Sequence, residues 1–449
     1  MSRLFGTDGV RGLANRELTP ELAFRLGRAA GAVLEREGRA RFLVGADPRR
    51  SSGMLEAALV AGLASVGADV ERLGVVTTPG VAFLVRKTAA SAAAMVSASH
   101  NPAEYNGIKF FSAEGFKLPD QLEDEIEALL GEERQAGLPR PEGAALGGVT
   151  QREELAEEYI RFLAGSVPEG ALAGLRLVVD CANGAASRIA PEALRRLGAR
   201  VTVLHAEPDG LNINAGCGSL HPEGLARAVR EAGAEAGLAF DGDADRCIAV
   251  DERGQVLDGD QILAILAADR QSRGRLAGDT VVGTVMTNLG LELALGEMGL
   301  RLLRAKVGDR YVLEAMLRHG YVLGGEPSGH VILRDLHTTG DGILTGIQML
   351  AAARRMGAKL SELGGRVRKL PQVQLNVPAP ERDGLESNPR IAAARAEVEQ
   401  ALAGHGRLVL RPSGTEPLVR VMVEAEDEEK ARAAAQRLAR VVEAELGRR

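Results

Sequence analysis

The stretch AMVSASHNPAEYNGIK, Ala94 to Lys109, decides the fold because an apolar run passes directly into a polar turn. The run AAAMV, which ends at Val96, predicts a buried strand, and Ser97 to Pro102 supplies turn-forming residues. The hydroxyl of Ser99 should therefore emerge at the carboxyl end of a strand, where open α/β sheets place their chemistry.

The second half of this stretch predicts a cation near the serine. Asn101-Pro102 forces the chain out of any helix, and Asn106-Gly107 indicates a second tight turn that returns Lys109 toward Ser99. A Ser-His-Asp hydrolase is disfavoured, because the side chains of adjacent Ser99 and His100 rarely meet and no G-x-S-x-G motif surrounds the serine. A serine-rich surface turn is the alternative for this stretch taken alone.

The whole chain narrows the function classes. Its 449 residues exceed one hydrophobic core and predict about three or four domains. A net charge of −6 without a long Lys/Arg block argues against a nucleic-acid partner, and 3% aromatic residues with no Trp argue against single-strand binding. Phosphate ligands would therefore need a local basic pocket.

The cysteines and the hydropathy pattern predict a cytoplasmic protein with no membrane partner. Cys181, Cys217 and Cys247 are odd in number and lack metal-type spacing, so neither a disulfide framework nor a zinc site is indicated. The amino terminus has no apolar core, and no run approaches the roughly 20 apolar residues of a spanning helix.

One pattern of strand, loop, helix, glycine and strand occurs three times, starting at Phe42, Arg176 and Thr280. The second strand of each copy follows a glycine: Gly67, Gly198 or Gly299. These glycines are too far apart for a solenoid repeat. The chain is therefore expected to hold three similar α/β domains with mixed or parallel sheets.

Shifts in composition predict four domains: 1–150, 151–255, 256–370 and 371–449. The first boundary lies near the Gly- and Pro-rich stretch 131–148, and the second lies between a turn at Asp251 to Gly254 and a helix from about Asp258. The last domain is smaller and of α+β design, with two strands and a long amphipathic helix from Asp427.

Three acidic residues, Asp241, Asp243 and Asp245, alternate after an apolar strand. In a looped backbone their carboxylates can converge on one hard cation, and Mg²⁺ fits best. An EF-hand is excluded because Arg246 stands where glycine is required and the flanking segments are strands. A solvated acidic turn stays open, although three such carboxylates would repel one another without a cation.

Two further loops predict ligand contacts. In GEPSGH, small neighbours flank Glu326 and Ser328, an acceptor and a donor suited to sugar hydroxyls, although an ordinary turn remains the alternative. His330 taken alone is typical of a structural histidine. Arg11, in FGTDGVRG, is expected in a Gly-rich loop before a first helix capped by Thr19.

The motif RPSGTEP predicts a phosphate cradle. Ser413, Gly414 and Thr415 offer hydroxyls and backbone N–H groups, while Arg411 and Arg420 supply charge and forked donors. The chain has no Walker A sequence, so this is not a nucleotide P-loop, and a chance turn is the alternative. A serine, a metal loop, a sugar loop and a phosphate cradle are together what phosphoryl transfer requires.

The chain resembles the α-D-phosphohexomutase family over its whole length. The motifs that carry the resemblance are, in this order, FGTDGVRG, SASHNP, DGDADR, GEPSGH and RPSGTEP. The resemblance implies three similar α/β domains with mixed sheets and a smaller α+β carboxyl-terminal domain around a central cleft. It also implies an isomerase whose Ser99 is phosphorylated, with one Mg²⁺ held by the Ser99 phosphate and by Asp241, Asp243 and Asp245. The phosphoserine then passes its phosphoryl group to a sugar monophosphate through a 1,6-bisphosphate.

The resemblance also implies roles for the remaining residues. Glu326 and Ser328 match the sugar-hydroxyl ligands. The distal phosphate ligands would be Arg411, Ser413, Gly414, Thr415 and Arg420. The catalytic set near the transferring phosphoryl group would be Ser99, Arg11, Lys109, Arg246 and His330.

VGDRYV and HTTGDG are similar to the glucosamine branch of that family. This branch implies interconversion of glucosamine 6-phosphate and glucosamine 1-phosphate, with glucosamine 1,6-bisphosphate as activator and intermediate, for UDP-N-acetylglucosamine and peptidoglycan synthesis. Pro327 departs from the pattern, which keeps a phosphoglucomutase/phosphomannomutase of broader hexose specificity open. Three carboxylates could meet the C2 ammonium: Asp309, Glu326 or Asp341.

Two rival functions stay open: a metal-dependent phosphatase with Ser99 as nucleophile, and a non-catalytic sugar-phosphate sensor. The sequence leaves the oligomeric state open, with a homodimer as one option. It also leaves open how much Ser99 is phosphorylated, by what route, and how far the last domain moves.

Overall fold

A computed structural model describes residues 3–34, 39–380, 384–413 and 417–447. The chain divides into two compact units, of which the first comprises residues 1–284 and 305–365. The second unit comprises residues 285–304 and 366–449. No helix among the described residues is long and apolar enough to span a membrane. Cys181, Cys217 and Cys247 are all free and buried.

The first sheet carries the serine loop. Its strands are β1 (Val10–Leu13), β2 (Arg41–Ala46), β3 (Asp69–Val75), β4 (Ala92–Val96), β5 (Tyr105–Ser112) and β6 (Val149–Gln151). They lie in the order β1-β5-β4-β2-β3-β6, with β5 antiparallel to β1 and β4 while β2 is parallel to β3 and β4. The strand predicted at AAAMV is β4, which is central in the sheet and buried at every residue.

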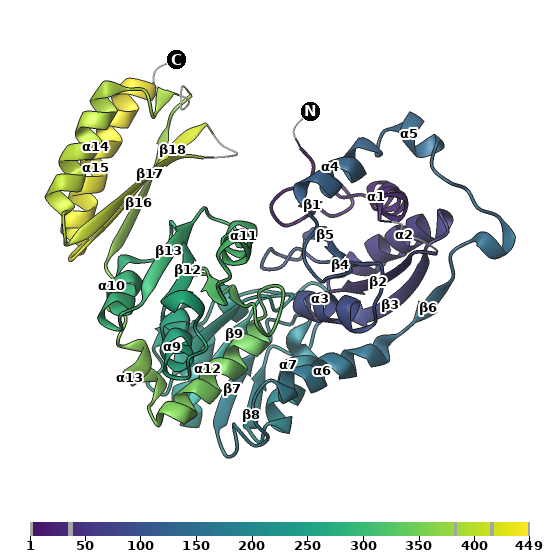
Figure 1. The fold of residues 1–449 in the computed structure, drawn as a ribbon, viewed down its shortest axis with the longest axis horizontal. Coiled ribbons are helices and arrows are strands. Elements are labelled where there is room, and N and C mark those ends of the chain that lie inside the picture. The colour runs from purple at the N-terminus through teal and green to yellow at the C-terminus, as the bar shows by residue number, and fades with distance from the viewer. Residues whose placement is uncertain (1–2, 35–38, 381–383, 414–416, 448–449) are drawn as a thin grey trace. The chain divides into compact units, whose positions relative to one another are not determined.

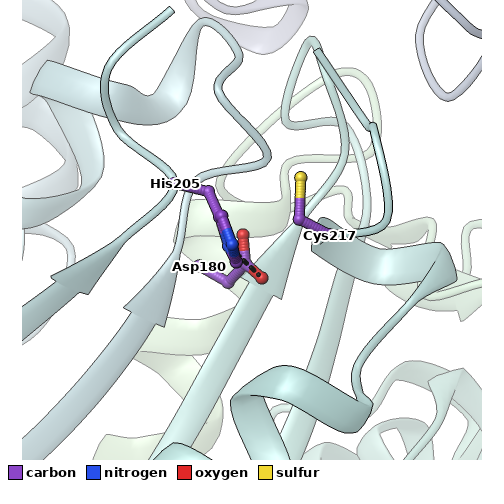
Figure 2. Close-up of side chains that lie close together, drawn as sticks. All are labelled: Asp180, His205 and Cys217. Carbon is purple, nitrogen blue, oxygen red and sulfur yellow. Dashed lines mark ion pairs between the residues drawn. The ribbon is translucent and has the colours of Figure 1, made fainter. Parts of the chain in front are cut away.

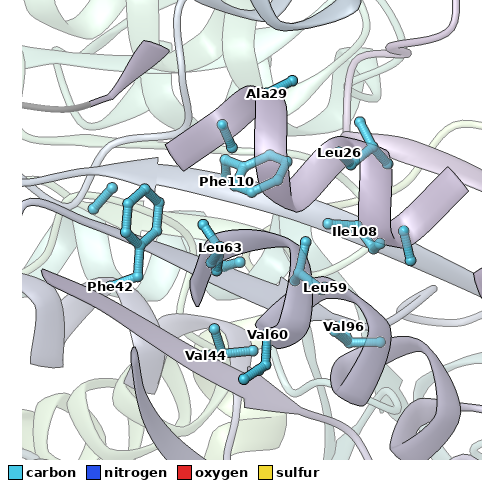
Figure 3. Close-up of a cluster of buried hydrophobic side chains, with 14 of the residues drawn as sticks. Leu26, Ala29, Phe42, Val44, Leu59, Val60, Leu63, Val96, Ile108 and Phe110 are labelled. Atoms are coloured by element: carbon cyan, nitrogen blue, oxygen red, sulfur yellow. The ribbon is translucent and has the colours of Figure 1, made fainter. Parts of the chain in front are cut away.

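Helices cover this sheet and form its core. They are α1 (Pro20–Val33), α2 (Ser52–Ser65), α3 (Thr78–Lys87), α4 (Asp120–Ala128) and α5 (Glu132–Ala136). As predicted, α1 is capped by Thr19, whose Oγ1 accepts a 3.2 Å hydrogen bond from the Leu22 N–H. Figure 3 shows side chains of α1 and α2, among them Leu26 and Leu59, packed over Phe42 and Phe110 of the sheet.

The second sheet carries the acidic loop. Its strands are β7 (Arg176–Asp180), β8 (Arg200–Leu204), β9 (Ala236–Phe240), β10 (Cys247–Asp251) and β11 (Val256–Leu257), in the order β11-β10-β9-β7-β8. The accompanying helices are α6 (Ala156–Gly165), α7 (Ala186–Arg196) and α8 (Glu223–Ala232). The predicted turn at Asp251 to Gly254 is confirmed, since it joins the antiparallel strands β10 and β11.

The remaining part of the first unit carries the loop GEPSGH, which the sequence predicts to bind a sugar. Its elements are α9 (Gly259–Ser272), β12 (Thr280–Thr284), α11 (Asp309–His319), β14 (Leu323–Gly325), β15 (Val331–Leu333), α12 (Gly342–Met356) and α13 (Leu360–Gly364). Strand β14 is parallel to β12 and antiparallel to β15. Asp258 and Gln261 form a capping box, which explains why α9 begins where the sequence predicts.

The second unit has a three-stranded antiparallel sheet in the order β16-β18-β17. Its elements include α10 (Leu289–Glu297), β13 (Arg301–Ala305), β16 (Gln372–Pro378), α14 (Pro389–Leu402), β17 (Gly406–Pro412), β18 (Leu418–Ala425) and α15 (Glu428–Leu446). Helices α14 and α15 lie side by side against this sheet (Figure 1). Strand β16 and helix α14 were not predicted, because the Pro and Gly residues near them favour a linker.

The threefold repeat is confirmed. Its copies are β2-α2-β3, β7-α7-β8 and β12-α10-β13. Gly67, Gly198 and Gly299 all have positive φ angles, which glycine adopts without the steric cost that other residues carry. The fold is therefore of the expected class, with three α/β arrangements and a smaller carboxyl-terminal one.

The contact between α1 and α2 depends on two glycines. A Cβ atom on Gly62 would lie 2.2 Å from the Phe24 carbonyl oxygen, and one on Gly27 would lie 2.3 Å from the Leu59 carbonyl oxygen. Neither backbone atom can move without separating the helices.

We therefore expect Gly62→Ala to lower the free energy of unfolding by about 1–3 kcal/mol through overpacking. Gly53→Ala, in the same helix with no atom within 4 Å of the added Cβ, is the matched control and should change stability by less than about 1 kcal/mol. Urea unfolding of both variants measures the difference, and equal stabilities would show that the helices separate without cost.

Candidate active site

The acidic loop between β9 and β10 brings three carboxylates together. One oxygen from each of Asp241, Asp243 and Asp245 lies within 4.8 Å of the other two, and all three residues are buried. Strands flank the loop on both sides, so the exclusion of an EF-hand is confirmed. The alternation of acid and small residue lets one short turn point three carboxylates at one position.

The electrostatics of this cluster suit a divalent cation. Burial, together with repulsion by Asp245 and Asp243, raises the pKa of Asp241 well above its usual range. The Oδ1 atoms of Asp243 and Asp245 are buried and have no hydrogen-bond partner among the described residues. Buried, unpartnered carboxylate oxygens at this spacing are the ligand set that Mg²⁺ prefers, so the three residues could hold a metal ion.

Lys109 faces this cluster from β5. Its Nζ lies 2.8 Å from Asp243 Oδ2 and 3.1 Å from Asp8 Oδ2, and its side chain is buried. Burial lowers the pKa of Lys109, but Asp243 and Asp8 outweigh it and raise the pKa, so the amine stays charged. The Thr78 hydroxyl donates a 2.5 Å hydrogen bond to the same Asp243 oxygen.

The expected turn at Asn106-Gly107 is wrong. Both residues lie inside β5, where Gly107 is opposite Arg11 of β1. The reversal is instead made by the residues between β4 and β5, and Lys109 faces Met95 in register. Asn-Gly has high turn propensity, but pairing on both sides of β5 outweighs it.

Ser99 lies in the reversal after β4 with a φ of +52°. Its Oγ donates a 2.6 Å hydrogen bond to Asp241 Oδ2, and its backbone N–H donates to Ser97 Oγ at 2.9 Å. The residue is buried. The predicted hydroxyl at the carboxyl end of a strand is therefore in contact with the predicted metal loop.

The expectation that Ser99 and His100 do not meet is wrong. The left-handed conformation of Ser99 brings its Oγ to 3.3 Å from Nδ1 of His100. Burial and the nearby cations of Arg246 and Arg11 lower the pKa of His100 to about 4, so its ring is neutral at pH 7. Asp245 and Asp243 act on His100 in the opposite direction but do not outweigh burial and the two cations.

The two predicted arginines approach the site in different ways. Arg11 was expected in a loop but lies in strand β1, and its guanidinium forms an ion pair with Asp8. The Arg246 backbone N–H donates to Asp241 Oδ1 at 3.1 Å, and its Nε lies 3.9 Å from Asp245 Oδ1. Both side chains are partly exposed, so they can reach an anion beside the loop.

His330 is part of a charge network that the sequence only partly revealed. Its Nδ1 lies 3.6 Å from Asp245 Oδ2, and its Nε2 lies 3.7 Å from Asp309 Oδ2. Burial lowers its pKa, but these two carboxylates outweigh burial and raise it to about 8. Lys117 extends the network with a 2.6 Å contact to Asp309 and a bond to Asp8. No sequence motif pointed to Lys117.

Glu326 and Ser328 lie in the turn between β14 and β15, as predicted. Glu326 Oε1 accepts a 3.0 Å hydrogen bond from the Gly308 N–H, which ties this turn to the VGDRYV segment. Ser328 Oγ has no hydrogen-bond partner among the described residues. Glu326 is partly exposed and so can meet a ligand, whereas the Oγ atom of Ser328 is buried.

In the second unit, Arg411 of β17 lies directly opposite Arg420 of β18. Burial and the like charge of Arg420 lower the pKa of Arg411. Such a pair of facing cations is suited to a bound anion. Ser413 follows β17 and is buried, while Gly414 and Thr415 lie outside the described residues.

A second group of metal-type side chains was not expected from the cysteine spacing. Asp180, His205 and Cys217 place one potential ligand atom each within 4.8 Å of the others (Figure 2). His205 Nδ1 lies 3.0 Å from Asp180 Oδ2, and the carboxylate also accepts hydrogen bonds from the Ala182 and Gly218 N–H groups. Burial and Asp180 raise the pKa of Cys217 to about 12. Asp180 therefore acts as an anchor for the neighbouring turns.

Four family models match the chain. They describe phosphoglucomutase/phosphomannomutase alpha/beta/alpha domain I at residues 2–137, domain II at 157–254, domain III at 258–370 and the C-terminal domain at 375–441. The chain belongs to the phosphoglucomutase/phosphomannomutase family.

Curated relatives lie in one branch of this family. The phosphoglucosamine mutase of Symbiobacterium thermophilum is 56% identical over 450 residues, covering 99% of this chain and 100% of the relative. The phosphoglucosamine mutase of Desulforudis audaxviator is also 56% identical, over 98% of each chain.

Solved structures agree in fold. A phosphoglucomutase/phosphomannomutase family protein from Burkholderia thailandensis has a TM-score of 0.82 at 26% identity, over 99% of this chain and 98% of that one. The N-acetylphosphoglucosamine mutase of Aspergillus fumigatus, in complex with GlcNAc-6P and magnesium, has a TM-score of 0.71 at 18% identity, over 98% and 95%. Another structure of that fungal enzyme contains glucose 1,6-bisphosphate, with a TM-score of 0.65 at 18% identity, over 98% and 95%.

The repulsion within the acidic loop predicts a metal-dependent stability. Mg²⁺ should raise the Tm of the wild type, because it would bind the folded state and not the unfolded one. A ligand of this kind adds about 2.7 kcal/mol to the free energy of unfolding when its free concentration is 100 times Kd. Asp241→Asn should remove this response while leaving the metal-free protein at least as stable, since one repelling charge is gone. Scanning calorimetry with Na⁺ at matched ionic strength as the control tests this, and an equal Mg²⁺ response in the variant would contradict it.

Proposed function

We propose that this chain is a phosphoglucosamine mutase, which interconverts glucosamine 6-phosphate and glucosamine 1-phosphate. The observation that carries the proposal is the 2.6 Å contact between Ser99 Oγ and Asp241, at the edge of a buried acidic triad. The 56% identity to phosphoglucosamine mutases over the whole chain supports the amino sugar as substrate.

In this proposal Ser99 carries the phosphoryl group. Asp241, Asp243, Asp245 and the Ser99 phosphate would hold one Mg²⁺, which would neutralise the transferring phosphoryl oxygens. The site's own cations act on the same oxygens: Lys109, Arg11 and Arg246. Lys109 is held as a permanent cation by the carboxylates around it, so it stabilises charge and does not act as a base.

The transfer itself exchanges two bonds at phosphorus. A sugar hydroxyl oxygen bonds to phosphorus while the bond from phosphorus to Ser99 Oγ breaks, and this yields a 1,6-bisphosphate. The hydroxyl proton leaves to a base in the site, and Ser99 Oγ regains a proton. Neutral His330, whose pKa is about 8, would accept the sugar hydroxyl proton, and Ser99 Oγ would take up a proton relayed from solvent through His100, whose Nδ1 lies 3.3 Å from Oγ. In the return half both proton transfers run in the opposite direction.

The return half uses the same residues. Glucosamine 1,6-bisphosphate, the activator and intermediate, turns over within the site and gives its other phosphate to Ser99. Glu326 and Ser328 would bind sugar hydroxyls during both halves. The distal phosphate would be held by Arg411, Ser413, Gly414, Thr415 and Arg420.

We assign the four domains to residues 1–150, 151–255, 256–370 and 371–449, which the ranges of the four family models support. The product would supply the synthesis of UDP-N-acetylglucosamine and of peptidoglycan, and we place the protein in the cytoplasm. A homodimer is the assembly state that we propose to test.

Of the three carboxylates considered for the C2 ammonium, Glu326 is the best placed. Both oxygens of Asp341 are engaged, by the Tyr159 hydroxyl at 2.7 Å and by a backbone N–H, and the residue is buried. Asp309 is neutralised by Lys117. Glu326 is partly exposed, and its carboxylate is held toward VGDRYV by the Gly308 N–H.

The first test compares kcat/KM for the 6-phosphates of glucosamine, glucose and mannose, with Mg²⁺ and a trace of the 1,6-bisphosphate. We expect a preference for glucosamine 6-phosphate that Ser99→Ala abolishes. Comparable turnover of glucose or mannose phosphates would instead favour the broader hexose branch. Stoichiometric release of inorganic phosphate would favour a phosphatase, and binding without turnover would favour a sensor.

The second test concerns Glu326. Because an ammonium beside a carboxylate gains a charged hydrogen bond that a hydroxyl lacks, Glu326→Gln should lower kcat/KM for glucosamine 6-phosphate about tenfold more than for glucose 6-phosphate. Asp341→Asn, whose side chain is bonded away from solvent, is the control and should affect both sugars alike. Equal losses for both sugars in Glu326→Gln would remove this role.

A further inference from the structure

Ser99 holds an uncommon backbone conformation. Its φ of +52° lies in the left-handed region, which a residue other than glycine adopts at a cost that its surroundings must offset. This conformation turns Oγ toward Asp241 and His100. The groups that enforce it therefore decide where the hydroxyl points.

Two side chains bind the Ser99 carbonyl oxygen. Arg49 Nη2 donates to it at 2.8 Å, and Asn214 Nδ2 donates to it at 2.9 Å. The same two nitrogens also donate to the Asn101 carbonyl oxygen, at 2.8 and 3.1 Å. Both side chains are buried. We call this pair of donors the carbonyl clamp.

Each donor is itself held in place. Asp47 Oδ2 lies 2.9 Å from Arg49 Nε, and it also accepts a 2.7 Å hydrogen bond from Ser97, whose Oγ in turn accepts the Ser99 N–H. Asn214 has a φ of +59°, and its N–H donates to the Ala182 carbonyl oxygen at 2.9 Å. Arg49 lies in the segment between β2 and α2, and Asn214 lies in the segment that follows β8.

The anchor around Asp180 supports the second donor. Asp180 accepts the Gly218 N–H and lies against His205, so it fixes the end of the segment that carries Asn214 (Figure 2). Gly242 of the acidic loop packs against both partners of the clamp, because a Cβ there would lie 2.6 Å from the Ser99 carbonyl oxygen and 3.0 Å from Asn214 Nδ2. The serine loop and the metal loop are therefore packed on the same amide.

We propose that Arg49 and Asn214 are positioning residues that keep Ser99 in its left-handed conformation through both halves of the reaction. This inference rests on the proposed function, in which Ser99 alternates between hydroxyl and phosphoester. The bond from Ser99 Oγ to Asp241 needs the hydroxyl hydrogen, which the phosphoester lacks. The clamp contacts the backbone carbonyl oxygens of Ser99 and Asn101 and not the Ser99 side chain, so it needs no hydroxyl hydrogen and holds the serine when the side-chain bond is lost.

Substitutions at Asn214 test the clamp. Asn214→Gly removes the donor and tolerates the positive φ, and Asn214→Asp keeps the shape without N–H groups. Asn15→Gly, at an exposed asparagine with a φ of +62°, is the matched control. We expect the rate of Ser99 phosphorylation by glucose 1,6-bisphosphate, followed by intact-protein mass, to fall about 10- to 100-fold in both Asn214 variants, with KM little changed. The control should keep the wild-type rate.

Hydrogen exchange of residues 97–103 is the second readout. In Asn214→Gly these amides should exchange faster than in the wild type and in Asn15→Gly, while the Tm of all three proteins stays similar. Wild-type phosphorylation rates or unchanged exchange in the Asn214 variants would overturn the clamp. A wild-type protein that takes no phosphate onto Ser99 would overturn the proposed function. Hydrogen exchange of residues 97–103 would then still show whether Asn214 holds the Ser99 backbone.

Discussion

The repulsion among three buried carboxylates is the constraint on which the rest of the site depends. Asp241, Asp243 and Asp245 are packed more closely than unpaired charges tolerate, and burial adds to the cost. Cations on several sides offset this repulsion, and Lys109 and His330 make the nearest contacts. Such a cluster favours a divalent cation among the acids and an anion beside the cations.

The sheets determine how this balance is built. The serine follows β4, the acids follow β9, and the turn with Glu326 and Ser328 follows β14, so each group stands at the carboxyl end of a strand in its own sheet. Short strands and buried loops hold the groups there with backbone hydrogen bonds. Glycines at the closest approaches, Gly242 above all, let the loops pack in contact, because a Cβ atom there would push them apart. Rigid placement of this kind lowers the cost of orienting a substrate.

Three local expectations failed for one shared reason. Asn106-Gly107 has the chemistry of a turn, Arg11 stands among glycines, and Ser99 and His100 are sequence neighbours whose side chains normally diverge. In the structure the first two belong to paired strands, and the third pair meets because Ser99 adopts a positive φ. In each case pairing or packing with a distant segment outweighed the local preference, and no local pattern reports such a partner.

The sequence by itself determined the repeated α/β design, the acidic loop, the serine that follows β4 and the family, because these depend on short motifs and on strand and helix periodicity. Only the tertiary structure decided which charges surround the acids. Asp8, Lys117 and Asp309 come from separate segments and form one network, and Arg49 and Asn214 meet at a single carbonyl. The physical reason is that hydrogen bonds and ion pairs depend on distances of about 3 Å in space, and separation along the chain does not encode those distances.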